Sequence, residues 1–324
     1  MAKANQSLPP SSPKINTLDC KILRELDQDA SQSLSQIGKK FKTTRDVIHY
    51  RVRRLESLGI IRKYVTLIDY SKLGFFAGST NLKLQHSSFD LKKQLIENIT
   101  SDPRVFWFSE RDGRYDFEFG WFVRTIPEVK ELQRELIGEY ARHVRDTSFM
   151  LSAKFYQFRR KYLYKGKNDY HILEAKPERR TDKTDEEILK ILGDNARMAD
   201  VEIAKKVGLS AAQVHYRIKN MKENDVILGS RCSLDIGYEK YRFDIYLDDY
   251  SIHDSVITFA VQHPNAVFAY DGVGGADLAL GFEVKDYKQL KLIEEEFKNQ
   301  FGDEINYLEI VRSKDHKSIH LPLL

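Results

Sequence analysis

The segment Thr43–Leu55, TTRDVIHYRVRRL, returns 166 residues later as Leu209–Met221, LSAAQVHYRIKNM. Around it, 18–64 aligns with 184–230 without a gap, and twelve aligned positions are identical. A repeat of this length means that each copy is one structural unit, so we interpret the chain as a tandem duplication.

Within each copy, the apolar residues of this region recur every three or four positions. The first copy contains three such stripes: Leu18, Ile22 and Leu26; Leu34, Ile37 and Phe41; and Ile48, Val52 and Leu55. This spacing predicts three short helices that share one small core. In the second copy, Thr184 with Glu187 and Ser210 with Gln213 predict capping boxes for the first and third helices. Apolar pairs after the third helix, at 60–61 and 226–227, predict a wing or strand.

The rest of each copy alternates between strand and helix periodicity in the order β-α-β-β-α-β. The predicted elements are 75–85, 90–99, 105–109, 115–123, 129–140 and 147–158 in the first copy, and 241–247, 255–262, 266–270, 277–284, 287–301 and 305–311 in the second. Such a domain covers one sheet face with helices and leaves the other free to pair with another domain. The predicted fold class is α+β, with two copies of a winged helix-turn-helix (three-helix) domain followed by a ferredoxin-like domain.

These patterns also give the domain boundaries. We predict a disordered tail at 1–14, winged helix-turn-helix 1 at 15–65, ferredoxin-like domain 1 at 66–160, a basic linker at 161–183, winged helix-turn-helix 2 at 184–231 and ferredoxin-like domain 2 at 232–324. The linker is expected to be partly helical around His171–Ala175. The tail lacks the apolar core of a signal peptide, and no window approaches 18 apolar residues in a row. We therefore predict no membrane partner and a cytoplasmic location.

The exposed face of the third predicted helix is cationic, aromatic and rich in hydrogen-bonding groups. Arg45, His49 and Arg53 are spaced i, i+4, i+8 and form one edge. In a helix-turn-helix this edge reaches bases in the major groove, whereas residues near the core boundary and the preceding turn meet phosphates. The predicted DNA-binding residues are Lys39, Lys40, Lys42, Thr44, Arg45, Asp46, His49, Tyr50, Arg51, Arg53 and Arg54, with Ser210, Gln213, His215, Tyr216, Arg217 and Lys219 in the second copy.

The two copies differ in net charge. Between residues 15 and 64, eleven Lys and Arg residues face six acidic residues, a balance of +5, whereas between 184 and 230 seven face eight, a balance of −1. Phosphate neutralisation supplies most non-specific affinity for DNA, so the first copy should make the main contact. The alternative is a solvated amphipathic helix without a ligand. The three-helix context, the repeated His-Tyr-Arg and the charge balance favour DNA binding.

The sequence suggests little other chemistry. Cys20 and Cys232 occupy unmatched positions, which favours packing over a disulfide or zinc site. The histidine spacing predicts no metal site, and we expect neither catalytic residues nor a cofactor. The segment Gly272–Gly275 lies between predicted strands and is interpreted as a turn. One aromatic set in the first ferredoxin-like domain predicts packing, with a small-molecule pocket as the alternative: Phe106, Trp107, Phe108, Phe117, Phe119, Trp121 and Phe122.

This order of parts resembles the leucine-responsive regulators (Lrp/AsnC, or feast/famine, family), here as a fused tandem duplication of the helix-turn-helix plus sensor (RAM) unit. The resemblance rests on Ile48–Ile61 and Leu209–Lys219, each followed by a β-α-β-β-α-β domain. It implies a sequence-specific DNA-binding transcriptional regulator, not an enzyme, that binds double-stranded DNA. It further implies a homo-oligomer, a dimer of fused chains, through the sensor-domain sheets. An amino-acid effector is also implied, with Gly113, Asp116, Gly274 and Asp277 as candidate residues.

Two other functions stay open. Siroheme decarboxylases resemble the same architecture, sometimes as fused copies, and use His and Arg residues of the β-rich domain on an anionic tetrapyrrole. No histidine is matched between the β-rich halves of this chain, which favours the regulator. A ligand sensor that has lost DNA binding is disfavoured by the +5 balance. The sequence does not decide whether the copies pair within one chain, or whether the second helix-turn-helix binds DNA.

Overall fold

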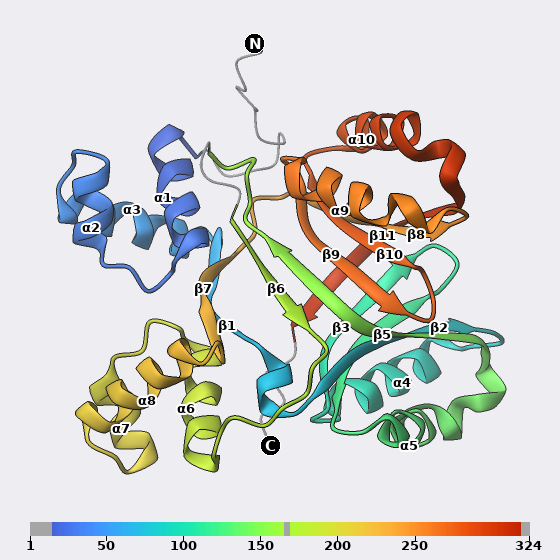
Figure 1. The fold of residues 1–324 in the computed structure, drawn as a ribbon, viewed down its shortest axis with the longest axis horizontal. Coiled ribbons are helices and arrows are strands. Elements are labelled where there is room, and N and C mark those ends of the chain that lie inside the picture. The colour runs from blue at the N-terminus through green and yellow to red at the C-terminus, as the bar shows by residue number, and fades with distance from the viewer. Residues whose placement is uncertain (1–14, 165–168, 319–324) are drawn as a thin grey trace.

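The computed structural model describes residues 15–164 and 169–318. Two helical heads lie side by side at one end of the molecule, and two ferredoxin-like domains form the other end (Figure 1). The predicted tail at 1–14 lies outside the described residues. Within the described residues, no helix is long and apolar enough to cross a membrane.

Each head has the predicted order of three helices and one strand. The first head consists of α1 (Thr17–Gln28), α2 (Leu34–Lys40), α3 (Arg45–Ser57) and β1 (Ile61–Ile68), and the second of α6 (Lys183–Asp194), α7 (Asp200–Val207), α8 (Ala211–Glu223) and β7 (Ile227–Leu234). The predicted stripes supply one core in the first head, which includes the buried side chains of Ile22, Leu26, Ile37, Ile48, Val52 and Leu55.

Of the two capping boxes predicted for the second copy, one is confirmed and one is wrong. Ser210 and Gln213 form the predicted capping box of α8, with both side chains accepting backbone N–H bonds. The box predicted from Thr184 and Glu187 is wrong, because α6 begins at Lys183 and Asp182 is its N-cap. The Asp182 side chain accepts from the backbone N of Asp185 at 2.8 Å and stabilises the first turn.

The strands that follow the third helices pair with each other. Strand β1 is antiparallel to β7, with Tyr64 opposite Cys232. Cys232 is fully buried in the core of the first head, and Ile68 is buried in the core of the second. Each head therefore completes its core with a strand from the other copy, and Cys232 has the packing role that the sequence predicted.

Both ferredoxin-like domains follow the predicted order. The first consists of β2 (Phe76–Leu84), α4 (Phe89–Ser101), β3 (Val105–Asp112), β4 (Phe117–Val123), α5 (Ile126–Ile137) and β5 (Val144–Phe158), and the second of β8 (Glu239–Leu247), α9 (His253–Gln262), β9 (Ala266–Val273), β10 (Leu278–Val284), α10 (Tyr287–Phe301) and β11 (Ile305–Ser318). Short 3₁₀ turns cover Tyr70–Leu73, Gly138–His143, Tyr250–Ile252 and Gly302–Glu304.

The last strand of each ferredoxin-like domain crosses to the other copy. Strand β5 pairs with β9, and β11 pairs with β3. Because β2 also pairs with β5, the strands close into a ring in the order β2-β4-β3-β11-β8-β10-β9-β5. The two copies thus pair within one chain, and their sheet faces cover each other. A second chain would have to bind through another surface.

The linker contains a strand where the sequence predicted a helix. Strand β6 (Tyr170–Glu174) pairs antiparallel with the end of β5, with Phe155 opposite Leu173. The helix predicted around His171–Ala175 is therefore wrong. The far end of β5 offers unpaired backbone groups along its edge, and the linker satisfies them by adding a strand.

Candidate nucleic-acid interface

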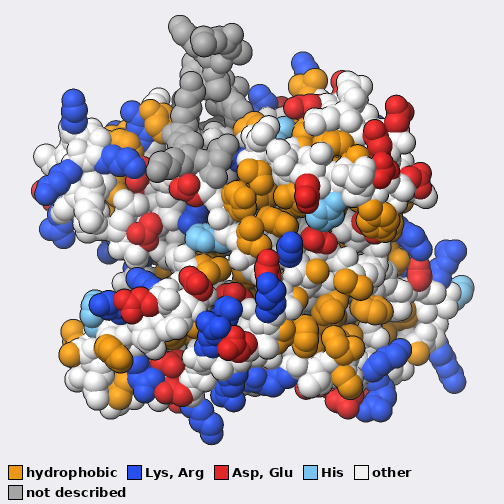
Figure 2. Space-filling view, in the orientation of Figure 1, with side chains coloured by type: hydrophobic (Ala, Val, Ile, Leu, Met, Phe, Trp, Pro, Cys, Tyr) orange, Lys and Arg blue, Asp and Glu red, His pale blue; other side chains and the backbone are white. Residues whose placement is uncertain are grey.

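The exposed face of α3 carries the groups that the sequence predicted for base contacts. The side chain of Thr44 caps the helix by accepting from the backbone N of Val47 at 3.3 Å. The first reading face, as we call it, consists of five exposed residues: Arg45, Asp46, His49, Tyr50 and Arg53. Tyr50 is 69% exposed, although its ring is largely apolar. Lys and Arg side chains project from the outer surface of this head (Figure 2).

Two of the predicted DNA-binding arginines form ion pairs with an acidic residue of the same head. The carboxylate of Asp19 on α1 is fully buried and lies 2.9 Å from Arg51 Nη1 and 3.4 Å from Arg54 Nη1. The second head repeats this contact, because Arg217 Nη1 lies 2.7 Å from the carboxylate of Asp185. The matched arginine of the two copies therefore ties the third helix to the first, and the phosphate contact that we predicted for Arg51 stays a prediction.

The turn before α3 is cationic and strained. Lys39 and Lys42 are exposed, and Lys40 is 55% exposed although its Nζ lies 2.6 Å from Glu25. Lys42 has φ +52°, in the left-handed region, where the second head has Gly208 with φ +69°. A non-glycine residue in this conformation costs about 1 kcal/mol. The first head thus places a positive charge where glycine would be conformationally favoured.

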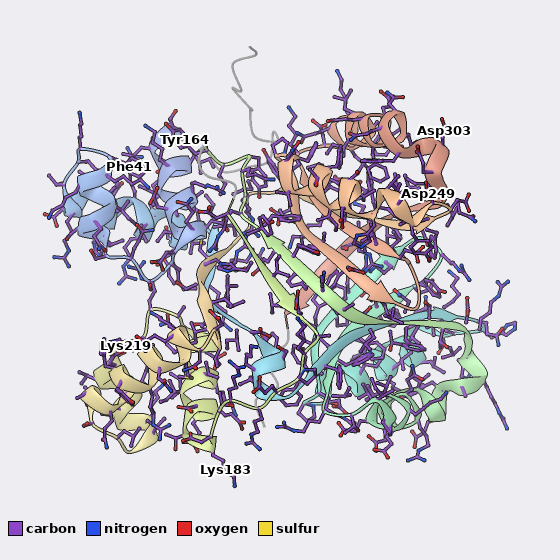
Figure 3. The ribbon with its side chains drawn as sticks, in the orientation of Figure 1. Phe41, Tyr164, Lys183, Lys219, Asp249 and Asp303 are labelled. Carbon is purple, nitrogen blue, oxygen red and sulfur yellow. The ribbon has the colours of Figure 1, made fainter. Side chains whose placement is uncertain are left out.

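The matching face of α8 has one lysine and no acidic residue, where the face of α3 has two arginines and one aspartate. Ala211 stands where the first head has Arg45, and His215 Nδ1 lies 3.0 Å from the carboxylate of Asp200. Lys219 is exposed on this face (Figure 3), 3.7 Å from Glu223 one turn later. The formal charge is nevertheless +1 on both faces, because Asp46 offsets one of the two arginines of α3, so the charge difference between the copies lies outside these faces.

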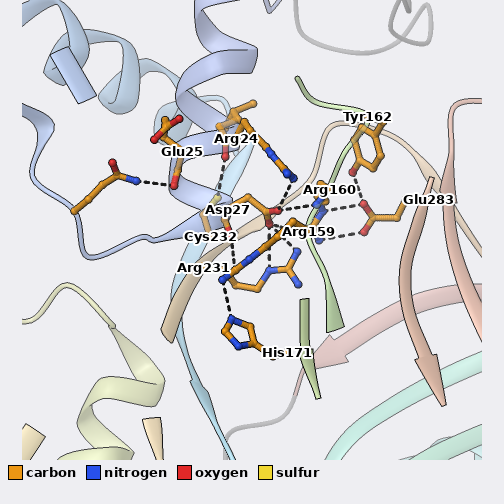
Figure 4. A network of polar contacts seen from close by, with 12 residues as sticks. Arg24, Glu25, Asp27, Arg159, Arg160, Tyr162, His171, Arg231, Cys232 and Glu283 are labelled. Atoms are coloured by element: carbon orange, nitrogen blue, oxygen red, sulfur yellow. Dashed lines mark hydrogen bonds and ion pairs between the residues drawn. The ribbon is translucent and has the colours of Figure 1, made fainter. Parts of the chain in front are cut away.

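A buried network of charges attaches the first head to the rest of the molecule (Figure 4). Asp27, near the end of α1, accepts from Arg160 Nη1 at 2.9 Å and from Arg231 Nη2 at 2.6 Å. Arg160 follows β5 and also donates to both carboxylate oxygens of Glu283 on β10, at 2.8 and 3.1 Å. We call these four residues, together with Arg159, the anchor network.

Electrostatics hold the anchor network in one ionisation state. Burial opposes ionisation of Asp27, but Arg231 and Arg160 outweigh it and lower its pKa to about 2. Burial also opposes ionisation of Glu283, whose pKa is likewise lowered to about 2, mainly by Arg160. Burial and the charge of Arg159 lower the pKa of His171 to about 4, so the neutral ring accepts from Arg159 Nη2 at 2.8 Å.

The second head has no counterpart of this network among the described residues. Gly193, Val65 and Phe122 occupy the positions of Asp27, Arg231 and Glu283. An aromatic cluster lies here instead, with the ring centroid of Phe122 4.2 Å from those of Tyr70 and Phe106. The sequence analysis missed the anchor network. Its signal was a charged residue, Asp27, within the apolar stripe of α1 where the second copy has glycine.

The candidate effector residues occupy matched turns. Asp116 accepts from the backbone N of Leu84 at 2.7 Å, and Asp277 accepts from the backbone N of Leu247 at 2.9 Å. Each carboxylate therefore ties its turn to the end of the first strand of its domain. Gly113 and Gly274 lie in the same turns, and the predicted turn at 272–275 is confirmed by the positive φ of Gly274 and Gly275.

The aromatic set divides between the two interpretations of the sequence. Four members pack in the core between sheet and helices, namely Phe108, Phe117, Phe119 and Trp121. Phe106 and Trp107 line a cavity of about 340 Å³ between the two sheets. Packing and a pocket are therefore both present, on opposite faces of the first sheet.

Comparisons with known proteins agree with the architecture of the heads. A family model described as winged helix-turn-helix DNA-binding matches residues 15–62 and again 181–227. An uncharacterized HTH-type transcriptional regulator of Pyrococcus furiosus is 30% identical over 128 residues, which are 39% of this chain and 84% of that protein. The HTH-type transcriptional regulator LrpC of Bacillus subtilis is 39% identical over 61 residues, 19% of this chain and 42% of that protein.

One solved structure is similar over nearly the whole chain. The crystal structure of the siroheme decarboxylase NirDL has a TM-score of 0.65 and 14% sequence identity, and the match covers 95% of this chain and 94% of that chain. At this identity the likeness shows a shared fold and leaves the function to the residues of the site.

Proposed function

Because this chain belongs to the Lrp/AsnC family of helix-turn-helix transcriptional regulators, we propose that it binds double-stranded DNA mainly through the first reading face. The observation that carries the proposal is the contrast between two matched helices. Both expose His-Tyr at the same place and a cation one turn later, Arg53 on α3 and Lys219 on α8, but only α3 adds a cation in its first turn, Arg45. A solvated helix without a ligand does not require this extra arginine.

The contacts follow from the geometry of the first head. Helix α3 enters the major groove, where Arg45 and Arg53 donate to base edges. Lys39 and Lys42, exposed before the helix, lie on the phosphate backbone. The second head is fixed beside the first by the pairing of β1 with β7 and meets the neighbouring duplex more weakly. The operator would then have one strong and one weak half-site.

Duplexes selected from a randomised pool test this proposal, with affinity measured between about 50 and 200 mM salt. We expect Arg45→Ala with Arg53→Ala to weaken binding at least about tenfold and to reduce the salt slope by about two, the number of cations removed. The matched control, Lys219→Ala on α8, should change affinity by less than about threefold. Arg54 is avoided, because it pairs with Asp19.

Equal losses from both variants would show that the heads contribute equally. Unchanged binding by the double variant would reject the first reading face as the DNA contact. Thermal unfolding of each variant checks that the exposed substitutions leave the fold intact, as their lack of core contacts predicts.

The same proposal includes an effector and further assembly. The support for an amino acid at the turns of Asp116 and Asp277 is that the two turns match, although both carboxylates already accept backbone N–H bonds. Equilibrium dialysis against the common amino acids would test it, with Asp277→Asn as the variant. A dimer of fused chains would have to use outer surfaces, which sedimentation can measure. With DNA as the partner, the location that we propose is the cytoplasm.

A siroheme decarboxylase-like enzyme is the second candidate. The fold match and the arginines of the cavity between the sheets favour it. Against it, no histidine of the described residues lines this cavity. Iron-uroporphyrin III, an analogue of which is bound in a structure of NirDL, is a direct probe. A shift of its absorption spectrum by the protein, followed by decarboxylation of siroheme, would favour the enzyme. If the protein neither binds iron-uroporphyrin III nor decarboxylates siroheme, the enzyme is rejected and the regulator remains as the proposed function.

A further inference from the structure

Polar and aromatic side chains line the space between the two sheets. Along β8, Phe243 belongs to the core beneath the helices, Lys240 and Arg242 line the cavity between the sheets, and Tyr241 contributes to both. On the facing sheet, Ser79 lines the same cavity. The period of two along β8 thus directs Lys240 and Arg242 into the ring and Phe243 away from it.

The acidic groups of this cavity are already paired. Glu118 accepts from Arg242 Nη1 with both carboxylate oxygens, at 2.7 and 2.6 Å, and it also pairs with Arg111. Glu283 is held by Arg160 in the anchor network. Neither carboxylate is left to bind the ammonium group of a ligand.

Donors in the same cavity lack partners. Within the described residues, Ser79 Oγ and Arg111 Nε are buried without a hydrogen-bond partner, and no ion pair or hydrogen bond involves Lys240 Nζ. Burial lowers the pKa of Lys240, against the opposing charge of Glu283. Unsatisfied buried donors and a half-buried cation are costly, and an anion that reached them would reduce that cost.

The remaining walls are aromatic. Phe106 and Trp107 from the first copy and Phe268 from the second line the cavity, whose volume of about 340 Å³ is in the range of small-ligand sites. Gly281 lets the ring of Phe268 lie against β10, because a Cβ there would fall 2.1 Å from the ring. A flat apolar body fits these walls.

We propose that the cavity between the two sheets binds a small aromatic organic acid, with its carboxylate at Lys240 and Ser79 and its ring among Phe106, Trp107 and Phe268. The site differs from the turns of Asp116 and Asp277 and takes a different ligand. An amino acid would bring an ammonium group for which the cavity has no available acceptor carboxylate. The ligand class is therefore an aryl carboxylate without a charged amine.

Three matched probes test the proposal on the full chain by calorimetry and tryptophan fluorescence, since Trp107 is in the wall. They are 3-phenylpropionate, L-phenylalanine, which adds the amine, and 3-phenylpropanol, which removes the charge. We expect 3-phenylpropionate to bind at least about tenfold more tightly than either of the others. Tighter or equal binding of L-phenylalanine, or no binding of 3-phenylpropionate at about 10 mM, would overturn the proposal.

Variants locate the site. Lys240→Gln should weaken 3-phenylpropionate at least about tenfold, and Ser79→Ala about threefold. Lys288→Gln, which removes an exposed lysine on α10, should leave the affinity unchanged. If Lys240→Gln lowers the thermal midpoint, its loss of affinity could come from altered folding. The affinity of Ser79→Ala then decides between the two explanations, because this variant removes only one oxygen that has no partner. Unchanged affinity in both variants would place the ligand elsewhere and reject this site.

Discussion

The two heads share their helices but differ in surface and in attachment. The first head is cationic and is attached through buried charges centred on Asp27, whereas the second is nearly neutral and is attached through aromatic rings around Phe122. The duplication thus kept the apolar stripes that make a head and changed the residues that connect it. Apolar contacts tolerate small shifts, but a buried ion pair keeps its free energy only at one geometry. We infer that the first head is held in the more sharply defined orientation.

The largest expected effect comes from breaking the anchor network. Asp27→Ala leaves Arg160 and Arg231 without their shared carboxylate, and we expect it to lower the free energy of unfolding by about 3–5 kcal/mol. Asp194→Ala in the second head removes an exposed partner of Lys63 and should cost less than about 1 kcal/mol. Urea unfolding measures both. Similar losses in the two variants would contradict the role given to the buried network.

The pH dependence of stability tests the surroundings of the anchor network, because Arg159 of that network contacts His171. The pKa of His171 is about 4 in the folded chain and 6.5 as its ordinary value, so between these pH values only the unfolded state binds the proton. The free energy of unfolding should therefore fall as the pH decreases from about 6.5 to 4. Below pH 4, protonation of Asp27 should lower it further, because the folded pKa of that carboxyl is about 2.

His263, whose pKa burial also lowers to about 4, contributes in the same pH window. We expect His171→Gln and His263→Gln each to flatten part of this decline when urea unfolding is measured at pH 7, 5.5 and 4.5. A decline that His171→Gln leaves unchanged would argue against a neutral His171 imidazole that accepts from Arg159.

A smaller effect is expected from making the second head resemble the first. Ala211→Arg places on α8 the charge that Arg45 provides on α3, and it should raise DNA affinity about threefold to tenfold and steepen the salt slope by about one. Ala211→Gln adds similar length without charge. Equal gains from the two variants would show that contact area, not charge, separates the heads.

The smallest effect concerns the turn before the third helix. Lys42→Gly should relieve the left-handed strain and raise the free energy of unfolding by up to about 1 kcal/mol, while weakening DNA binding. Gly208→Lys should do the reverse to stability at the matching turn of the second head. Thermal unfolding and the DNA titration report the two quantities separately. A destabilised Lys42→Gly variant would mean that the lysine makes contacts that outweigh its strain.

Helical and strand periodicity predicted the elements well, because local spacing sets which face of an element is apolar. It failed where a cap, an open strand edge or an ion pair outside the apolar pattern decided the outcome. His171–Ala175 became a strand because β5 offered an open edge, and α6 began earlier than predicted because Asp182 provides the cap. Arg51 and Arg54 looked like surface charges, but Asp19 on another helix holds them.

The sequence by itself determined the duplication, the three-helix heads, the β-α-β-β-α-β domains and the charge difference between the copies, because these depend on residue types at short spacings. Only the tertiary structure decided that the copies pair within one chain, that the first head is attached through Asp27 and that a cavity with polar and aromatic walls lies between the sheets. Each of these depends on residues more than a hundred positions apart. The folding of the two copies around a common core, and not the local conformational preference of each segment, brings such residues into contact.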